Sequence, residues 1–487
     1  MIGFAAVVLI STGNCYCYWF CIQIIRFLEA GFCLPPALAR RERAHPRFCR
    51  SRPAFPQRKF ALETKVFLYN EGNDPRKPLF AQSARKPRTW TTQGKECSDM
   101  PSLETPEKPV VESTAMEISV NRQQLLRELT ATQGVVERKT TIPILSNFLL
   151  EATDDRLTIT ATDLDQSIRT SCEAKVKKPG ACTIPARKLY DYIKLLPDGE
   201  IGIKLMENHW VQIRLGRSNT KMVGMARANF PQVSPFPTAG AIRLPAAALR
   251  NMISKTIFAV ANEESRYTLN GALLLVKAGS LTMVATDGHR LAHIEKTGED
   301  LSVSGEKRLL IPRKALSELQ SLLANTEEEF IGFSDDEQTL YFQVGNRVLT
   351  SRKLTGQFPN YEAVLPRDNN RFVIVRTTDL LSSIQRVAQF ADERSGAVKL
   401  RLEQNEMKIS SSSTEAGESE DTIETPYNMD PLVIGFNSSY MVDFLKAVGD
   451  VSEVRLEFKD AQTAGQVRPE DAQDDFRYRY IIMPMRI

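Results

Sequence analysis

The chain has 487 residues, of which 42% are hydrophobic and 25% are charged, so it can form several domains that each have a core. Its net charge of +4 conceals an uneven distribution: residues 1–115 hold 17 basic and 10 acidic residues, and the remainder holds 46 and 49. Residues 116–487 carry a small net negative charge, so their overall charge does not attract nucleic acid. Any contact with nucleic acid must come from locally placed basic side chains.

Residues 1–115 differ in composition from the rest of the chain. The apolar start from Ile2 to Ile10 is too short to span a bilayer. From Pro35 to Pro109 the sequence is rich in proline, arginine and lysine and lacks strand or helix periodicity, which predicts disorder. We interpret residues 1–115 as an extension that is disordered or comes from a misassigned start, with the initiator at Met116. A membrane-tethering or targeting extension is the alternative.

The remainder contains an internal repeat. Residues 157–163 (LTITATD) recur as residues 281–287 (LTMVATD), and residues 229–232 (NFPQ) recur as residues 357–360 (QFPN), shifted by 124 and 128 positions. A more diverged third copy has residues 407–411 (MKISS) in the strand position. The predicted copies span residues 116–238, 239–367 and 368–487.

Each copy is predicted to begin with a short strand and an amphipathic helix, because apolar residues recur at spacings of three and four. These stripes are Leu125, Leu126, Leu129 and Val136; Leu249, Met252, Ile253, Ile257 and Val260; and Leu380, Leu381, Ile384, Val387 and Ala391. A second helix follows in each copy, with the stripes Leu189, Tyr192, Ile193 and Leu196; Leu316, Leu319 and Leu323; and Met441, Phe444, Leu445 and Val448. Pro185 and Pro312 suit a first helical turn, and Asn437 or Ser438 suits an N-cap.

Alternating strands such as Leu157–Ala161, Thr339–Val344 and Tyr478–Ile482 separate these helices. Two helices on antiparallel strands, repeated three times, predict an α+β architecture of three domains. A repeated unit builds a surface, a solenoid or a ring more readily than a single catalytic cleft. Units of this length favour a closed or curved arrangement.

Catalytic, cofactor and metal motifs are nearly absent. We find no phosphate loop, dinucleotide fingerprint, nucleophile elbow or metalloprotease helix, and we expect no cofactor and no metal. The segment from Thr286 to Arg290 (TDGHR) resembles an active-site loop, but its repeat partner lacks the Gly-His pair. Three interpretations remain open for it: catalysis, a turn in which Asp287 bonds its own backbone, and partner binding. The two cysteines of the remainder, Cys172 and Cys182, make no disulfide framework, which predicts a cytoplasmic protein.

Four separated motifs carry a family resemblance. Residues 266–271 (RYTLNG), 285–291 (ATDGHRL), 358–361 (FPNY) and 483–487 (MPMRI) closely resemble the bacterial DNA polymerase III beta subunit. The resemblance runs from Met116 to Ile487 and implies three clamp domains that close as a head-to-tail homodimer into a ring around double-stranded DNA. It implies a non-catalytic sliding clamp, a processivity factor in DNA replication that has polymerase activity only by association.

Several DNA contacts follow from this resemblance and from basic pairs on the repeated helices. They are Lys139, Arg187, Lys188, Glu263, Tyr267, Thr268, Arg313 and Lys314. Two of them depart from the expected pattern, because Glu263 is acidic and Thr268 replaces an aromatic residue. The alternative for the basic residues is an ordinary solvated helix face.

The resemblance also implies a cleft that receives short linear peptides from the polymerase alpha subunit, the clamp loader, translesion polymerases and mismatch-repair proteins. Its residues are Leu269, Thr286, Gly288, His289, Arg290, Leu291, Pro359, Val364, Ile481, Ile482, Met483, Pro484, Met485 and Arg486. Flexible methionine side chains suit a pocket that accepts several peptides.

Ring closure needs a reciprocal interface, and opposite charges suit it. The acidic residues Glu415, Glu418, Glu420, Asp421 and Glu424 of the third copy are predicted to face Arg214, Arg217 and Lys221 of the first copy. Besides the clamp, an enzyme and a monomeric peptide-binding scaffold remain as alternatives. Turnover would identify the enzyme, and sedimentation as a monomer would identify the scaffold.

Overall fold

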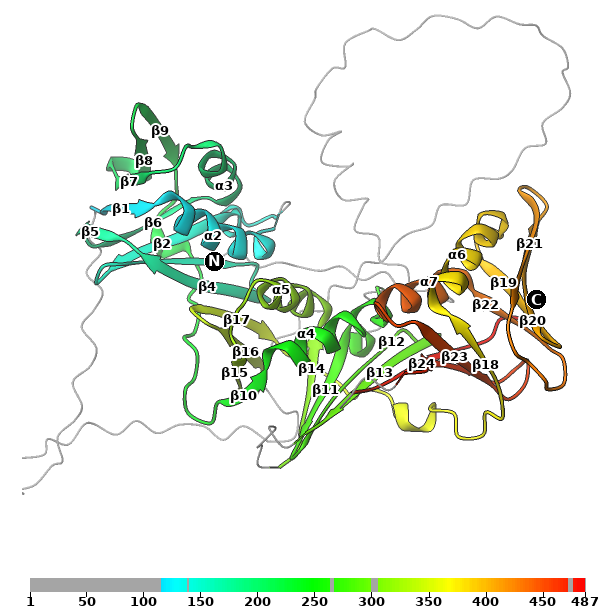
Figure 1. Cartoon of the computed structure of the whole chain (residues 1–487). Coiled ribbons are helices and arrows are strands. Elements are labelled where there is room, and N and C mark those ends of the chain that lie inside the picture. The colour runs from blue at the N-terminus through cyan, green and yellow to red at the C-terminus, as the bar shows by residue number, and fades with distance from the viewer. Residues whose placement is uncertain (1–114, 138–139, 263–266, 299–304, 472–475, 487) are drawn as a thin grey trace, which may run out of the picture. The chain divides into compact units, whose positions relative to one another are not determined.

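A computed structural model describes residues 115–137, 140–262, 267–298, 305–471 and 476–486 (Figure 1). The predicted extension, residues 1–115, lies almost wholly outside the described residues, as do Lys139 and Glu263. The chain divides into two units, and every described residue belongs to the second, residues 104–487. In this unit three copies of one α+β arrangement follow one another. Each runs strand, helix, four or five strands, helix and three strands.

The bounds of the elements are as follows. The first copy contains β1 (Glu117–Asn121), α2 (Arg122–Thr132), β2 (Asn147–Thr153), β3 (Arg156–Thr162), β4 (Gln166–Glu173), β5 (Lys175–Lys178), β6 (Gly180–Pro185), α3 (Ala186–Leu195), β7 (Glu200–Leu205), β8 (Trp210–Leu215) and β9 (Ser218–Val223). The second contains β10 (Ile242–Pro245), α4 (Ala246–Ser254), β11 (Gly271–Lys277), β12 (Ser280–Thr286), β13 (Arg290–Thr297), β14 (Lys307–Pro312), α5 (Arg313–Ala324), β15 (Phe330–Asp335), β16 (Thr339–Val344) and β17 (Arg347–Arg352). The third contains β18 (Arg371–Arg376), α6 (Thr377–Val387), β19 (Ala397–Glu403), β20 (Glu406–Ser413), β21 (Gly417–Glu424), β22 (Leu432–Asn437), α7 (Ser438–Ala447), β23 (Glu453–Phe458), β24 (Gly465–Pro469) and β25 (Phe476–Ile482).

Two of the four sheets cross from one copy to the next. Their strand orders are β5-β1-β7-β8-β9, β10-β15-β16-β17-β4-β3-β2-β6, β14-β11-β12-β13-β25-β24-β23-β18 and β21-β20-β19-β22. In the first junction β4 pairs with β17 antiparallel, placing Ile168 opposite Leu349. In the second junction β13 pairs with β25 antiparallel, placing Leu291 opposite Ile481. Continuous backbone hydrogen bonding therefore joins the three copies.

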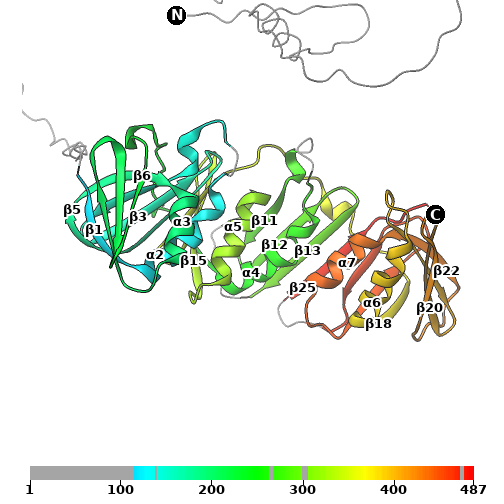
Figure 2. The same ribbon diagram turned by 90° about the horizontal axis from the view of Figure 1, so that it is seen from above.

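The two helices of each copy lie side by side against the sheets, and Figure 2 shows the three pairs in succession. The predicted stripes face the core: Leu125, Leu129, Leu189 and Ile193 are fully buried. The prediction of six helices on antiparallel strands is thus confirmed for the described residues.

The first helix of each copy ends earlier than its apolar stripe predicts. Helix α2 ends at Thr132, and Val136 follows a short 3-10 turn. In α2 the Thr132 hydroxyl donates back to the Glu128 and Leu129 carbonyl oxygens, a bond that competes with helix continuation. Ile257 and Ala391 likewise lie beyond α4 and α6. Val136 and Ile257 still pack against the core, but they lie in short turns and not in the helices.

The caps follow the sequence in part. The Asn437 side chain accepts from the Ser439 and Tyr440 amides, as predicted. Pro185 and Pro312 stand one position before the first helical turn, which corrects the expectation for them. Each remains the last residue of its strand, pairing with Asn147 and Gly271, because a proline φ near −60° suits both a strand end and a helix entry.

Candidate functional site

The Thr-Asp pair after β12 forms a turn. The Asp287 Oδ1 atom accepts from the amides of His289 (2.9 Å) and Arg290 (3.0 Å), and Thr286 Oγ1 donates to the Arg290 carbonyl oxygen at 2.6 Å. The same device recurs after β3, where Asp163 Oδ1 accepts from the Asp165 and Gln166 amides. The turn interpretation is therefore confirmed, and the Gly-His pair is an addition to a structural turn.

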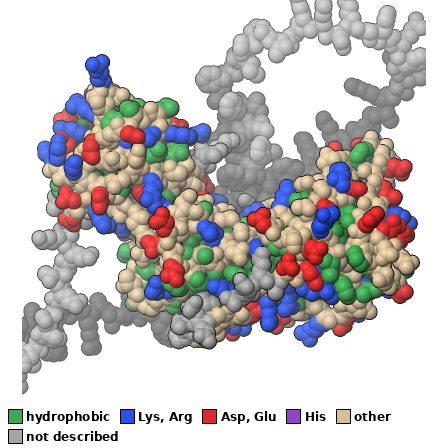
Figure 3. Space-filling view, in the orientation of Figure 1, with side chains coloured by type: hydrophobic (Ala, Val, Ile, Leu, Met, Phe, Trp, Pro, Cys, Tyr) green, Lys and Arg blue, Asp and Glu red, His purple; other side chains and the backbone are tan. Residues whose placement is uncertain are grey.

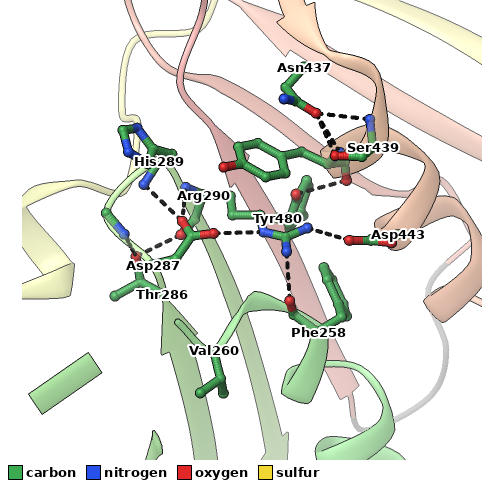
Figure 4. Close-up of polar contacts among 12 residues, drawn as sticks. Phe258, Val260, Thr286, Asp287, His289, Arg290, Asn437, Ser439, Asp443 and Tyr480 are labelled. Atoms are coloured by element: carbon green, nitrogen blue, oxygen red, sulfur yellow. Dashed lines mark hydrogen bonds and ion pairs between the residues drawn. The ribbon is translucent and has the colours of Figure 1, made fainter. Parts of the chain in front are cut away.

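Arg290, which follows that turn, connects the second copy to the third. Its guanidinium donates to Asp287 (3.0 Å), to Asp443 of α7 (2.7 Å) and to the Phe258 carbonyl oxygen (2.7 Å), as Figure 4 shows. It also lies 4.3 Å from the centre of the Tyr440 ring. Burial alone would lower the pKa of this guanidinium, but Tyr480, Asp443 and Asp287 raise its pKa above the ordinary value. Arg290 is thus a permanently charged bridge across the second junction.

An apolar cleft opens on the side of the second junction that faces away from the helices. It has a volume of about 120 Å³. Four chain segments form it: the turn before β11, the β12–β13 turn, the connection after β17 and the end of β25. The lining residues are Leu269, Thr286, Gly288, His289, Arg290, Leu291, Pro359, Tyr361, Val364, Ile481 and Met483.

The structure therefore brings ten of the fourteen predicted cleft residues together. It adds Tyr361, which belongs to the quoted FPNY motif but was not predicted to line the cleft. This tyrosine is 7% exposed and packs on Leu291 and Ile481 beneath the cleft. Burial raises the pKa of its hydroxyl, so it stays neutral.

Four predicted residues lie elsewhere. Ile482 is fully buried on the helix side of the sheet, because side chains alternate along β25 and Ile481 takes the cleft side. Met485 donates its amide to the Gly435 carbonyl oxygen at the edge of β22, which carries the chain end away from the cleft. Pro484 precedes that bond and Arg486 follows it, exposed to solvent. These four residues are not among those that line the cleft in this structure.

A buried histidine lies beneath the cleft wall. The ring of His293 lies 5.7 Å from that of Tyr361, and its side chain is 6% exposed. Burial, helped by the charge of Arg479, lowers the pKa of His293 to about 4, so the ring is neutral near pH 7. This histidine belongs to the packing of the second junction.

Some of the predicted DNA contacts are exposed to solvent, and others form hydrogen bonds or ion pairs within the chain. Arg187 and Lys188 project from the first turn of α3 and are exposed, with Arg187 3.9 Å from Asp191. Arg313 donates to the Val260 carbonyl oxygen, and Lys314 pairs with Glu137 and Asp163. Thr268 is half-buried, and the side chain of Tyr267 lies outside the described residues. Arg313 and Lys314 therefore already have partners within the chain.

The predicted interface residues lie on two edge strands. β9 and β21 each end a sheet, and Figure 3 shows basic side chains around the β8–β9 hairpin and acidic ones around β21. Arg214, Arg217 and Lys221 are exposed. The exposed acidic residues of β21 share one face: Glu418, Glu420 and Glu424. Asp421 takes the opposite face and pairs with Arg386 of α6 in the same copy, which corrects its expected position.

The described residues contain no cluster of three or more side chains suited to hold a metal ion. None of the helices in the described ranges is both long and apolar enough to cross a membrane.

Comparisons with known proteins point to a single family for the part of the chain that follows residue 115. Profiles of the DNA polymerase III beta subunit match in chain order: the N-terminal domain at residues 116–234, the central domain at 243–360 and the C-terminal domain at 362–486. The beta sliding clamp of Caulobacter vibrioides is 34% identical over 378 residues, which cover 76% of this chain and all of the relative.

Solved structures agree. A Pseudomonas aeruginosa sliding clamp bound to griselimycin has a TM-score of 0.71 at 34% identity, covering 77% of this chain and all of that one. A Caulobacter crescentus beta sliding clamp, with PEG bound to a region assigned to beta-motif tethering, has a TM-score of 0.71 at 33% identity with the same coverage.

Proposed function

The chain belongs to the DNA polymerase III beta subunit family, and we propose which of its surfaces close the ring, hold DNA and bind partners. As a beta sliding clamp it confers processivity on DNA polymerase III in DNA replication, and it is a non-catalytic subunit. Its three domains have boundaries that we propose at residues 238/239 and 367/368. We place it in the cytoplasm, because the free thiols of Cys172 and Cys182 are consistent with a reducing compartment.

Two copies of the chain close head to tail into a ring. The support is the pair of sheet edges at β9 and β21, which offer unpaired backbone groups to another strand. Exposed basic residues flank the first edge, and Glu418, Glu420 and Glu424 share one face of the second. This complementarity fixes orientation and register, while the strand pairing supplies contact.

Enclosure retains the duplex, so direct contacts are few and independent of sequence. Arg187 and Lys188 are exposed on α3 and can reach phosphates, because the pair of Arg187 with Asp191 is solvated and readily exchanged. Arg313 and Lys314 take part only by exchanging their present partners. Lys139, Glu263, Tyr267 and Thr268 complete the proposed set.

The cleft at the second junction binds short linear peptides of the polymerase alpha subunit, the clamp loader, translesion polymerases and mismatch-repair proteins. The observation that carries this proposal is the apolar lining of the cleft, with Val364 and Met483 on its exposed rim. The Caulobacter crescentus clamp holds PEG at its own beta-motif tethering region, which supports the assignment.

A fluorescence titration tests this proposal with a labelled peptide from the carboxyl end of the cognate polymerase alpha subunit. Val364→Glu puts a charge on the apolar rim, and we expect at least a tenfold loss of affinity because that carboxylate must be desolvated when the peptide binds. Val433→Glu is the matched control, since Val433 is similarly exposed at 41% but lies on β22, outside the cleft. Equal binding by both variants would remove the cleft assignment.

A further inference from the structure

A second groove lies at the first junction. Its lining comes from β3, β4, the start of β17 and the connection between the first two copies, and its volume is about 230 Å³. The lining residues are Thr158, Arg169, Thr170, Ser171, Ser234, Pro235, Phe236, Asn346 and Val348. Side chains alternate along β4, so Arg169 and Ser171 face away from helix α2, while the Thr170 hydroxyl donates to Glu128 of that helix. The groove therefore lies on the same side of the sheets as the cleft.

The groove is the repeat counterpart of the cleft. Each lies where a strand of one copy pairs with a strand of the next and a connecting segment crosses that seam. The shift of 128 residues between the two FP motifs makes Phe236 the counterpart of Val364. Gly332 of β15 admits the Phe236 ring close to the sheet, because a Cβ there would lie 3.2 Å from it. The connecting segment thus forms a defined wall.

The chemistry of the groove differs from that of the cleft. Arg169 is half-buried, and no hydrogen bond or ion pair joins its side chain to another described residue. Thr158, Ser171 and Ser234 line the groove together with Arg169, and Asn346 is held in place by donating to the Ser171 carbonyl oxygen. A guanidinium with five donors, which has no anionic partner among the described residues and shares its groove with several hydroxyls, matches the oxygen atoms of a carboxylate.

We propose that this groove is a second docking site, which binds an acidic segment of a partner protein by its carboxylates through Arg169. A peptide is favoured over DNA because the groove lies on the sheet side opposite the helices. An extended segment also suits a groove bounded by a strand and a connecting segment. Partners that reach both the cleft and this groove gain from being held at two points.

The test is a fluorescence anisotropy titration of the full chain with a fluorescein-labelled hexaglutamate peptide at 150 mM salt. We expect Arg169→Gln to weaken binding about tenfold, the loss expected when one charge-assisted hydrogen-bonding partner is removed. Arg169→Lys should retain part of the affinity, because it keeps the charge but loses the fork geometry. Neither change removes a hydrogen bond within the described residues, so thermal melting should be unaltered.

Arg401→Gln is the matched control, because Arg401 is a half-exposed arginine on β19 of the third copy. It should bind the peptide like the unaltered chain, and so should the cleft variant Val364→Glu. Equal affinity of the Arg169→Gln and Arg401→Gln variants would overturn the proposal. Loss of hexaglutamate binding in Val364→Glu would instead place the acidic peptide in the cleft and also overturn it.

Discussion

The two junctions share one backbone plan and use different chemistry. Both pair two strands antiparallel into an eight-stranded sheet. On the helix side, the first junction buries an ion pair between Glu128 of α2 and Arg347 of β17, and the second buries Arg290 among Tyr440, Tyr480 and Phe258. On the other side the first junction presents a polar groove and the second an apolar cleft.

This difference shows how a repeated unit acquires separate roles without changing its fold. Backbone hydrogen bonds between strands depend little on side chains, so the seam persists while the residues above and below it diverge. Function follows the chemistry of those residues. Variants at each seam can therefore test whether the two junctions are separable in stability and in binding.

The largest effect should come from the buried ion pair of the first junction. Glu128 accepts two hydrogen bonds from Arg347 at 2.9 Å, and these side chains are 6% and 7% exposed. Burial opposes the charge of Glu128, but the bonds from Arg347 and Thr170 keep its pKa below the ordinary value. Glu128→Ala leaves a buried charge unpaired and should lower the free energy of unfolding by about 3–5 kcal/mol in urea denaturation.

The double variant Glu128→Leu with Arg347→Met should recover much of this loss, because no buried charge remains. Asp379→Asn is the control on a surface pair, with Arg376 72% exposed, and should change stability by less than about 1 kcal/mol. A small effect of Glu128→Ala would mean that the strand pairing alone holds the first junction.

At the second junction, Arg290→Gln should cost about 2–4 kcal/mol in the same assay. It removes three hydrogen bonds from a nearly buried guanidinium and leaves Asp287 and Asp443 facing each other without the cation. Asp443→Asn should cost less, because the Asp443 side chain is 40% exposed and water can replace it. A larger loss from Asp443→Asn than from Arg290→Gln would contradict the bridge.

The free energy of unfolding should decrease in mild acid because of a buried histidine at the second junction. His293 titrates near 4 in the folded chain and near 6.5 when unfolded, so below pH 6.5 the unfolded state binds the extra proton. The free energy of unfolding should drop by about 2 kcal/mol between pH 7 and pH 5 from this group alone. His293→Gln should remove that part of the slope in urea denaturation at each pH. An unchanged slope would exclude His293 as its source.

The smallest effect is expected at Lys314, which joins the first two copies at the surface. Its side chain is 63% exposed and lies 3.5 Å from Asp163. Lys314→Ala should lower the free energy of unfolding by less than about 1 kcal/mol, because the lysine end is solvated and the buried Asp163 carboxylate keeps its bonds from the Asp165 and Gln166 amides. A loss comparable to that of Glu128→Ala would show that the first junction depends on its surface charges as well.

Much of the fold could be predicted from the sequence because the signals are local and repeated. The recurring LTITATD pattern, the stripes through Leu125 and Leu316 and the cap at Asn437 all act over a few residues. Helix ends were less predictable, since apolar residues such as Val136 pack equally well from a single turn.

The site could be predicted only where a motif gathers its residues. The β12–β13 turn and Met483 lie in quoted motifs and do line the cleft. The bridge from Arg290 to Asp443 joins residues 153 positions apart, and no pattern along the chain links them. Glu128 and Arg347 look like surface charges on their own elements, and only the strand pairing of the first junction brings them together in the core. Arg169 likewise becomes distinctive only through the absence of a partner among the described residues.

The most direct test of the clamp account is the loss of loaded protein from nicked circular DNA after the circle is cut. The full chain is loaded with the cognate clamp loader, free protein is removed, and bound protein is followed before and after linearisation. Enclosure by a closed ring predicts stable retention on the circle and rapid release from the linear ends. Retention after cutting would contradict the ring, because direct contacts would then be holding the DNA.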